Sequence, residues 1–157
     1  MKFISIIIIL ALIAIFGCES PQDLNRSGDK LSGLIIHVDT NLYLNGGYYS
    51  VSLYSADSVS PFNRVPVRTD SLRLTKRSDS LLYETTYDMN GIPAGRYYVA
   101  STWSSYPKVP NEVPIVLGTF GCDTSRTCTN HIILVYPNFE GNFRNILSWT
   151  DLAKRLN

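Results

Sequence analysis

Short segments in which apolar and polar residues alternate constrain the fold of this chain more than any other feature of its sequence. In one of them Tyr49, Val51 and Leu53 alternate with Ser50 and Ser52. Successive side chains of a β-strand point to opposite faces of the sheet, so this alternation is typical of a strand that is buried on one face. Seven such segments follow one another, at 33–38, 49–54, 72–74, 81–89, 96–103, 115–120 and 131–136.

Turn and loop signals separate these segments. Asn45-Gly46-Gly47 indicates a turn, because glycine readily adopts the positive φ that tight hairpin turns require. The stretch 56–68 contains Pro61 and Pro66, and the stretch 104–114 contains three prolines, so both are expected to be loops. The pattern predicts an all-β fold, a single seven-stranded antiparallel β-sandwich, with a β-barrel as the alternative.

The last residues change from the period of a strand to the period of a helix. Four apolar residues are spaced so that they share one helical face, namely Trp149, Leu152, Ala153 and Leu156. Ser148, three residues before Asp151, resembles the first residue of a capping box, with Asp in place of the usual Glu. We expect a short C-terminal helix that closes one end of the sandwich, or one that docks on a partner.

The N-terminus is apolar and follows a positive charge. After Lys2, the fourteen residues Phe3–Phe16 contain a single polar residue, Ser5. A helix that crosses the hydrocarbon core of a membrane needs about 20 apolar residues. A positive start, a short apolar run and small residues after it are instead typical of a signal peptide for export.

The end of this run, Ile15-Phe16-Gly17-Cys18, resembles the lipobox of bacterial lipoproteins, although Phe16 departs from that pattern. The resemblance implies that Cys18 receives diacylglycerol and becomes the first residue of the mature protein. It divides the chain into a signal peptide (1–17), an acylated N-terminus with a flexible, polar tether (18–32) and a domain (33–157). The alternatives are an uncleaved anchor or an ordinary signal peptide.

Lipid attachment would place the protein in the cell envelope, in the outer membrane if the source is Gram-negative. The membrane lipid joined to Cys18 would then be its first partner. A single acyl chain holds only marginally, so firm anchoring requires the several chains that such a cysteine carries.

Two further cysteines, Cys122 and Cys128, are separated by five residues. An even pair in an exported chain favours a disulfide, which in so small a loop contributes about 2–2.5 kcal/mol. Free thiols are one alternative. A metal site with His131 is another, but the spacing differs from that of structural zinc sites and no fourth ligand is evident, so we expect no metal.

The segment Tyr87–Val99 resembles a hairpin of carboxypeptidase regulatory-like, transthyretin-like sandwiches. Pro93 fixes φ, and Gly95 supplies a conformation that other residues resist, so the chain is expected to reverse here. Immunoglobulin-like modules use similar turns. The resemblance implies a non-catalytic accessory module and names no ligand.

Neither charge nor motifs indicate nucleic acid, a cofactor or catalysis. The chain has fourteen Lys and Arg against thirteen Asp and Glu, so it lacks the basic excess of a nucleic-acid-binding domain. Its two histidines, His37 and His131, lie on expected strands, and only His37 has a weak candidate partner, Asp39. We therefore expect a protein that is not an enzyme, and a hydrolase is the least favoured reading.

Aromatic residues offer the better functional signal, with ten Tyr and two Trp in the chain. Four of them are expected at strand ends or on outer faces, namely Tyr48, Tyr98, Trp103 and Tyr106. Such rings could form a platform for sugar rings or for an envelope protein, or they could simply be rim and core residues. The function predicted is a membrane-anchored binding or structural module, with carbohydrate binding as the alternative.

Overall fold

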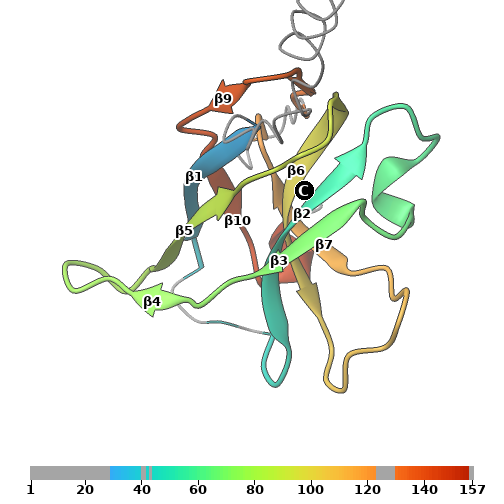
Figure 1. Cartoon of the computed structure of the whole chain (residues 1–157). Helices are drawn as coiled ribbons and strands as arrows, with labels where there is room; N and C mark the ends of the chain where they lie inside the picture. The colour runs from blue at the N-terminus through green and yellow to red at the C-terminus, as the bar shows by residue number, and fades with distance from the viewer. Residues whose placement is uncertain (1–28, 40–41, 43, 123–129, 156–157) are drawn as a thin grey trace, which may run out of the picture.

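The computed structural model describes residues 29–39, 42, 44–122 and 130–155, and it is all-β, with two sheets (Figure 1). The first sheet contains β1 (Lys30–His37), β4 (Thr75–Lys76), β5 (Tyr83–Met89), β9 (Glu140–Gly141) and β10 (Ile146–Ser148). The second sheet contains β2 (Tyr48–Ser55), β3 (Arg68–Ser71), β6 (Gly95–Ser104), β7 (Ile115–Thr119) and β8 (Ile133–Val135). Two helical turns complete the described elements, η1 (Pro61–Asn63) and α2 (Leu152–Arg155).

The first sheet is mixed, with the order β10-β1-β5-β4 and β9 also paired with β1. β1 and β5 are antiparallel, with Leu31 opposite Met89, whereas β9 and β10 run parallel to β1, with Ile35 opposite Ile146. The expectation of a fully antiparallel fold is therefore wrong. The two parallel strands are only two and three residues long, too short for an alternation to be visible in the sequence.

The second sheet is antiparallel and is built around β6, its longest strand. One edge of β6 pairs with the whole of β2, from Ser104 opposite Tyr48 to Tyr97 opposite Ser55. The other edge pairs with β8 near Gly95 and with β7 near its C-terminal end. β3 pairs with the outer edge of β2, which gives the order β3-β2-β6-β7.

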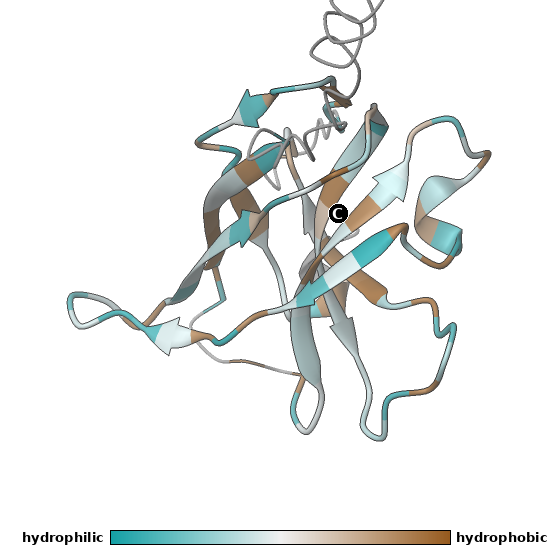
Figure 2. Ribbon diagram, viewed as in Figure 1, coloured by the Kyte–Doolittle hydropathy of each residue, from teal (hydrophilic) through white to brown (hydrophobic). Residues whose placement is uncertain are grey.

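One hydrophobic core joins the two sheets in a sandwich-like arrangement. Its buried members are Leu31, Ile35, Val51, Leu53, Tyr87, Met89, Ile92, Tyr97, Val99, Ile133, Val135, Phe139 and Ile146. In the ribbon coloured by hydropathy, hydrophobic residues lie on β1 and β10 of the first sheet and on β2 of the second (Figure 2). Full burial of a side chain of Leu or Ile size stabilises a fold by about 1.5–3 kcal/mol, so this shared core is what holds the sheets together.

The expected turn at Pro93 and Gly95 has a different role from the one predicted. It links β5 of the first sheet to β6 of the second, so it crosses between sheets and is not a hairpin within one. Ile92, at the start of the crossing, is fully buried in the core, and its N–H donates to the Asp29 carbonyl. The turn therefore ties the connection between the sheets to the beginning of β1.

The expectation of seven strands is also wrong. Six of the expected segments overlap strands, but Leu72 and Leu74 lie between β3 and β4. β3 has the polar sequence RTDS and shows no alternation. It is a strand because its backbone pairs with β2, whose Leu53 lies opposite Arg68.

The expected C-terminal helix is not found as predicted. Ser148, its expected cap, is the last residue of β10, and the Trp149 N–H donates to the Leu117 carbonyl of β7. Of the described residues of this segment, only Leu152–Arg155 are helical. The carboxylate of Asp151, just before them, accepts a hydrogen bond from the Ala153 N–H at 3.1 Å. Pairing with neighbouring strands overrides the helical spacing at Trp149, and Leu156 lies outside the described residues.

Candidate functional site

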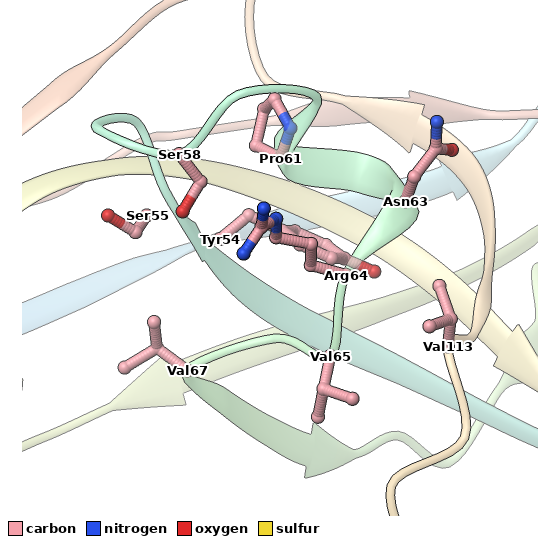
Figure 3. Close-up of a pocket in the computed structure, with 9 residues that line it drawn as sticks. All are labelled: Tyr54, Ser55, Ser58, Pro61, Asn63, Arg64, Val65, Val67 and Val113. Carbon is pink, nitrogen blue, oxygen red and sulfur yellow. The ribbon is translucent and has the colours of Figure 1, made fainter.

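A pocket of about 530 Å³ lies on the outer face of the second sheet, where the loop after β2 folds back over that strand (Figure 3). We call it the Tyr54 pocket. Its lining residues are Tyr54, Ser55, Ser58, Pro61, Asn63, Arg64, Val65, Val67 and Val113. Most of them belong to β2 and to the loop that contains η1, and Val113 comes from the loop before β7.

The alternation of β2 explains why Tyr54 lies in this pocket. Val51 and Leu53 point into the core, so Tyr54 points to the opposite face. Phe62 of η1 covers that face, with its ring 5.2 Å from the Tyr54 ring and in an edge-on orientation. The loop is held down at its end by Val67, whose N–H donates to the Leu53 carbonyl at 2.8 Å.

The Tyr54 hydroxyl is buried and has no hydrogen-bond partner among the described residues. The residue is only 1% exposed, although it lines the pocket. Burial raises the pKa of Tyr54, so the hydroxyl remains protonated and able to donate at neutral pH. A buried hydroxyl without a partner costs about 1–3 kcal/mol, and its burial keeps this one out of reach of a ligand in the open part of the pocket.

Among the described residues, Arg64 is the only charged one that lines the Tyr54 pocket. Its side chain is exposed, and it forms no salt bridge with any residue that the structure describes. In contrast, Arg68, Arg77 and Arg96 each form an ion pair with an aspartate, at 2.7–3.0 Å. The pocket therefore presents one positive charge that has no ionic partner among the described residues.

A second pocket, of about 560 Å³, lies on the first sheet beside β1 and β5. Several of its polar groups are already paired: Lys30 forms an ion pair with Asp88 at 2.7 Å, and the Tyr87 hydroxyl donates to the Arg144 carbonyl at 2.6 Å. Phe143 lies at its edge and is 85% exposed. Because these groups already have partners, this pocket offers a charged or polar ligand fewer free groups than Arg64 offers in the Tyr54 pocket.

The two residues of the expected pair, His37 and Asp39, are both buried. His37 is fully buried, and burial lowers its pKa to about 4, so the ring is neutral at pH 7. Neither of its ring nitrogens has a hydrogen-bond partner among the described residues, and the ring packs edge-on against Tyr49 at 5.3 Å. Asp39 therefore does not orient the imidazole, as it would in a base–carboxylate pair.

Asp39 instead binds the C-terminal segment. Its Oδ2 accepts hydrogen bonds from the Thr150 N–H at 2.8 Å, the Thr150 hydroxyl at 2.6 Å and the Asp151 N–H at 2.7 Å. His131 lies elsewhere, just before β8, where its ring packs edge-on against Phe120. The structure thus leaves the two histidines in separate surroundings.

Only two of the four aromatic residues predicted for a platform lie together. Tyr48 and Tyr106 are both exposed, with ring centroids 6.0 Å apart. On β6, Tyr98 lies six residues before Ser104, which pairs with Tyr48, and its ring packs against Phe62. Trp103 pairs with Tyr49 and points to the other face of β6 from Tyr98. A four-ring surface is therefore not assembled.

Several predicted sites lie outside the described residues. Cys18 and most of the expected tether belong to 1–28, and Cys128 belongs to 123–129, so lipid attachment and the disulfide with Cys122 stay predictions. Within the described part of the chain, no group of three or more His, Cys, Asp or Glu residues could hold a metal ion. The helices described there are too short to cross a membrane.

Sequence reasoning did not identify Tyr54 or Arg64. The available signal was a tyrosine at an outward position of an otherwise buried strand, followed by a proline-containing loop with an arginine. No family model, curated protein or solved structure matches this chain.

Proposed function

We propose that this protein is an exported lipoprotein of the cell envelope whose domain binds a ligand without catalysing a reaction. The apolar run that ends at Gly17-Cys18 supports export and lipid attachment. The fold would be of the transthyretin-like or immunoglobulin-like kind, which the two sheets around one core support.

The observation that carries the binding function is the Tyr54 pocket. It places Arg64, which forms no salt bridge with a described residue, beside the partly exposed apolar side chains of Val65 and Val67. A ligand could pair with this guanidinium and cover the apolar surface around it. Neither the buried His37 nor the exposed His131 is placed beside this pocket, which favours binding over hydrolysis.

Replacing Cys18 by serine should abolish lipid attachment, because serine lacks the thiol sulfur to which diacylglycerol is joined. Cells that express the full chain and are fed labelled palmitate should label the wild-type protein and leave Cys18→Ser unlabelled. Cys122→Ser is the matched control and should keep the label. Equal labelling of Cys18→Ser and the wild type would contradict the proposed anchor.

We also propose that Cys122 and Cys128 form a disulfide. Cys122 is half-buried and lies three residues after the end of β7, and its N–H donates to the Thr119 carbonyl at 3.1 Å. A Cys18→Ser chain that is exported, unfolded and left unreduced should therefore show no reactive thiol. Two reactive thiols per chain would refute the disulfide, and reduction before the assay supplies the positive control.

A further inference from the structure

We propose that the end of the domain at which β1 begins docks on the lipid surface that holds the anchor, through the exposed aromatic rings of Tyr136 and Phe143. This inference rests on the proposed lipid attachment at Cys18 and adds the orientation of the domain on the membrane. It is drawn from the place where the anchored segment enters the fold and from two exposed rings beside that place.

The proposed anchor enters the fold at the start of β1. Residues 19–29, eleven in number, separate Cys18 from Lys30, the first residue of β1. A flexible chain of that length spans about 17–20 Å on average, and a fully extended one spans at most about 40 Å. The lipid surface would therefore lie close to Lys30.

The segment that follows β8 lies at this same end of the domain. The Lys30 N–H donates to the Phe139 carbonyl at 2.9 Å, and the Phe139 ring packs edge-on against Tyr136, with ring centroids 5.4 Å apart. Phe143 lines the same pocket as Lys30. Figure 1 shows β9, which lies between the two exposed aromatic residues in the chain, beside the start of β1. Both exposed rings are thus near the residue at which the anchored segment enters.

The opposite end of the domain is much farther from the anchor. The first residue of β6 pairs with β8, directly before Tyr136, whereas its last residue pairs with Tyr48. Tyr106 follows β6 in the chain, is 71% exposed, and has its ring 6.0 Å from that of Tyr48. β6 has ten residues, and a strand of that length spans about 30 Å. The anchor therefore favours contact of the membrane with Tyr136 and Phe143 over contact with this second aromatic pair.

Phe143 is displayed to solvent at a cost to the backbone. Its φ of 59° lies in the left-handed region, which is unfavourable for a bulky residue. Its side chain is 85% exposed, so packing within the domain compensates little of this cost. Tyr136 is 55% exposed. Aromatic rings are favoured at the boundary between lipid headgroups and acyl chains, where the apolar ring is covered and a tyrosine hydroxyl stays in water.

The charges at this end balance, which favours a zwitterionic surface. Lys30 forms an ion pair with Asp88 at 2.7 Å. Glu140 and Arg144 carry opposite charges, and neither forms a salt bridge with a residue that the structure describes. Because the anchor already holds the domain beside the membrane, weak contacts of two rings suffice to orient it.

The test adds a tryptophan at one end of the domain or the other, in the lipid-anchored chain. Phe143→Trp and Tyr136→Trp add it near the start of β1, and Tyr106→Trp is the matched control; each replaces an exposed ring, so the fold is kept. The lipidated chain is purified in detergent and reconstituted into phosphatidylcholine vesicles, with or without bromine on the acyl chains, which quenches tryptophan only at short range. The fluorescence of the wild type, which contains Trp103 and Trp149, is subtracted.

Brominated lipid should remove about half or more of the fluorescence that Phe143→Trp and Tyr136→Trp add, because a ring at the boundary of headgroups and acyl chains lies about 5–10 Å deep, near the brominated carbons. Reconstitution should also shift the emission of these two variants to shorter wavelength, because the ring leaves water. The fluorescence that Tyr106→Trp adds should be unchanged by bromine and should keep the emission wavelength of an exposed ring.

The outcomes separate this inference from the anchor on which it rests. If the wild type floats with the vesicles in a density gradient but neither Phe143→Trp nor Tyr136→Trp is quenched, the anchor stands and the docking is overturned. Quenching of Tyr106→Trp to the same extent would show that the domain has no preferred orientation, which also overturns it. A shift of Phe143→Trp emission in native membranes but not in vesicles would identify a protein in place of lipid. If the wild type does not float, the anchor and the docking both fail.

Discussion

Replacing Asp39 by alanine should lower the free energy of unfolding by about 3–5 kcal/mol, among the largest effects expected of one substitution. The Asp39 carboxylate is almost fully buried and accepts three hydrogen bonds from Thr150 and Asp151. Alanine would leave these donors without their acceptor, two of them on the backbone. The segment after β10 would then lose its attachment to the end of β1.

Denaturant unfolding followed by circular dichroism measures this effect, and two further variants calibrate it. Asp39→Asn keeps an acceptor of similar shape and loses only the charge, so we expect about half the effect of alanine. Asp57→Ala removes an exposed aspartate whose ion pair with Arg96 is open to solvent, and it should cost less than about 1 kcal/mol. If Asp39→Ala were no more destabilising than Asp57→Ala, the link to Thr150 would contribute nothing to stability.

Gly118→Ala should destabilise the fold by about 2–4 kcal/mol, because β7 and β10 approach each other too closely for a side chain at this position. A Cβ on Gly118 would overlap the carbonyl oxygen of Leu147 and would crowd the Cα of Ser148. All of these atoms belong to the backbone of β10, which is also paired with β1, so no side-chain rotation can relieve the overlap. The two sheets would have to separate at this edge.

Gly95→Ala provides the comparison for Gly118→Ala. A Cβ on Gly95 would approach only the end of the Tyr97 side chain, which can move. We expect Gly95→Ala to stay within about 1 kcal/mol of the wild type in the same unfolding measurement. Equal stability of the two variants would mean that β7 and β10 are not packed as tightly as the structure shows.

The parts of the fold that the sequence predicted are those with a regular pattern on one strand. β2 and β6 could be predicted because residues of the core-facing side alternate with residues of the outer side over eight and ten residues. β3, with its sequence RTDS, and the very short β9 and β10 were missed, because their pairing depends on a neighbouring backbone and not on their own side chains. Ser148 was predicted to cap a helix because its place in β10 likewise depends on pairing with β1 and not on its own side chain.

The candidate site was less predictable than the strands. The role of Asp39 depends on Thr150, which lies 111 residues further along the chain, and no local pattern connects the two. The Tyr54 pocket exists because the loop with Phe62 folds over the outer face of β2, which would otherwise be exposed to solvent. Both features arise from tertiary packing, so they are visible only in the folded chain.

The most direct test of the whole account is the mass of the chain isolated from the membranes of its own cells. Removal of residues 1–17 and lipid attachment to Cys18 would make the N-terminal peptide begin at Cys18 and exceed its unmodified mass by the mass of the acyl chains. We expect this modified peptide to be the main form. A chain that still begins at Met1, with an unmodified Cys18, would contradict the proposed lipoprotein and with it the placement of the domain at the cell envelope.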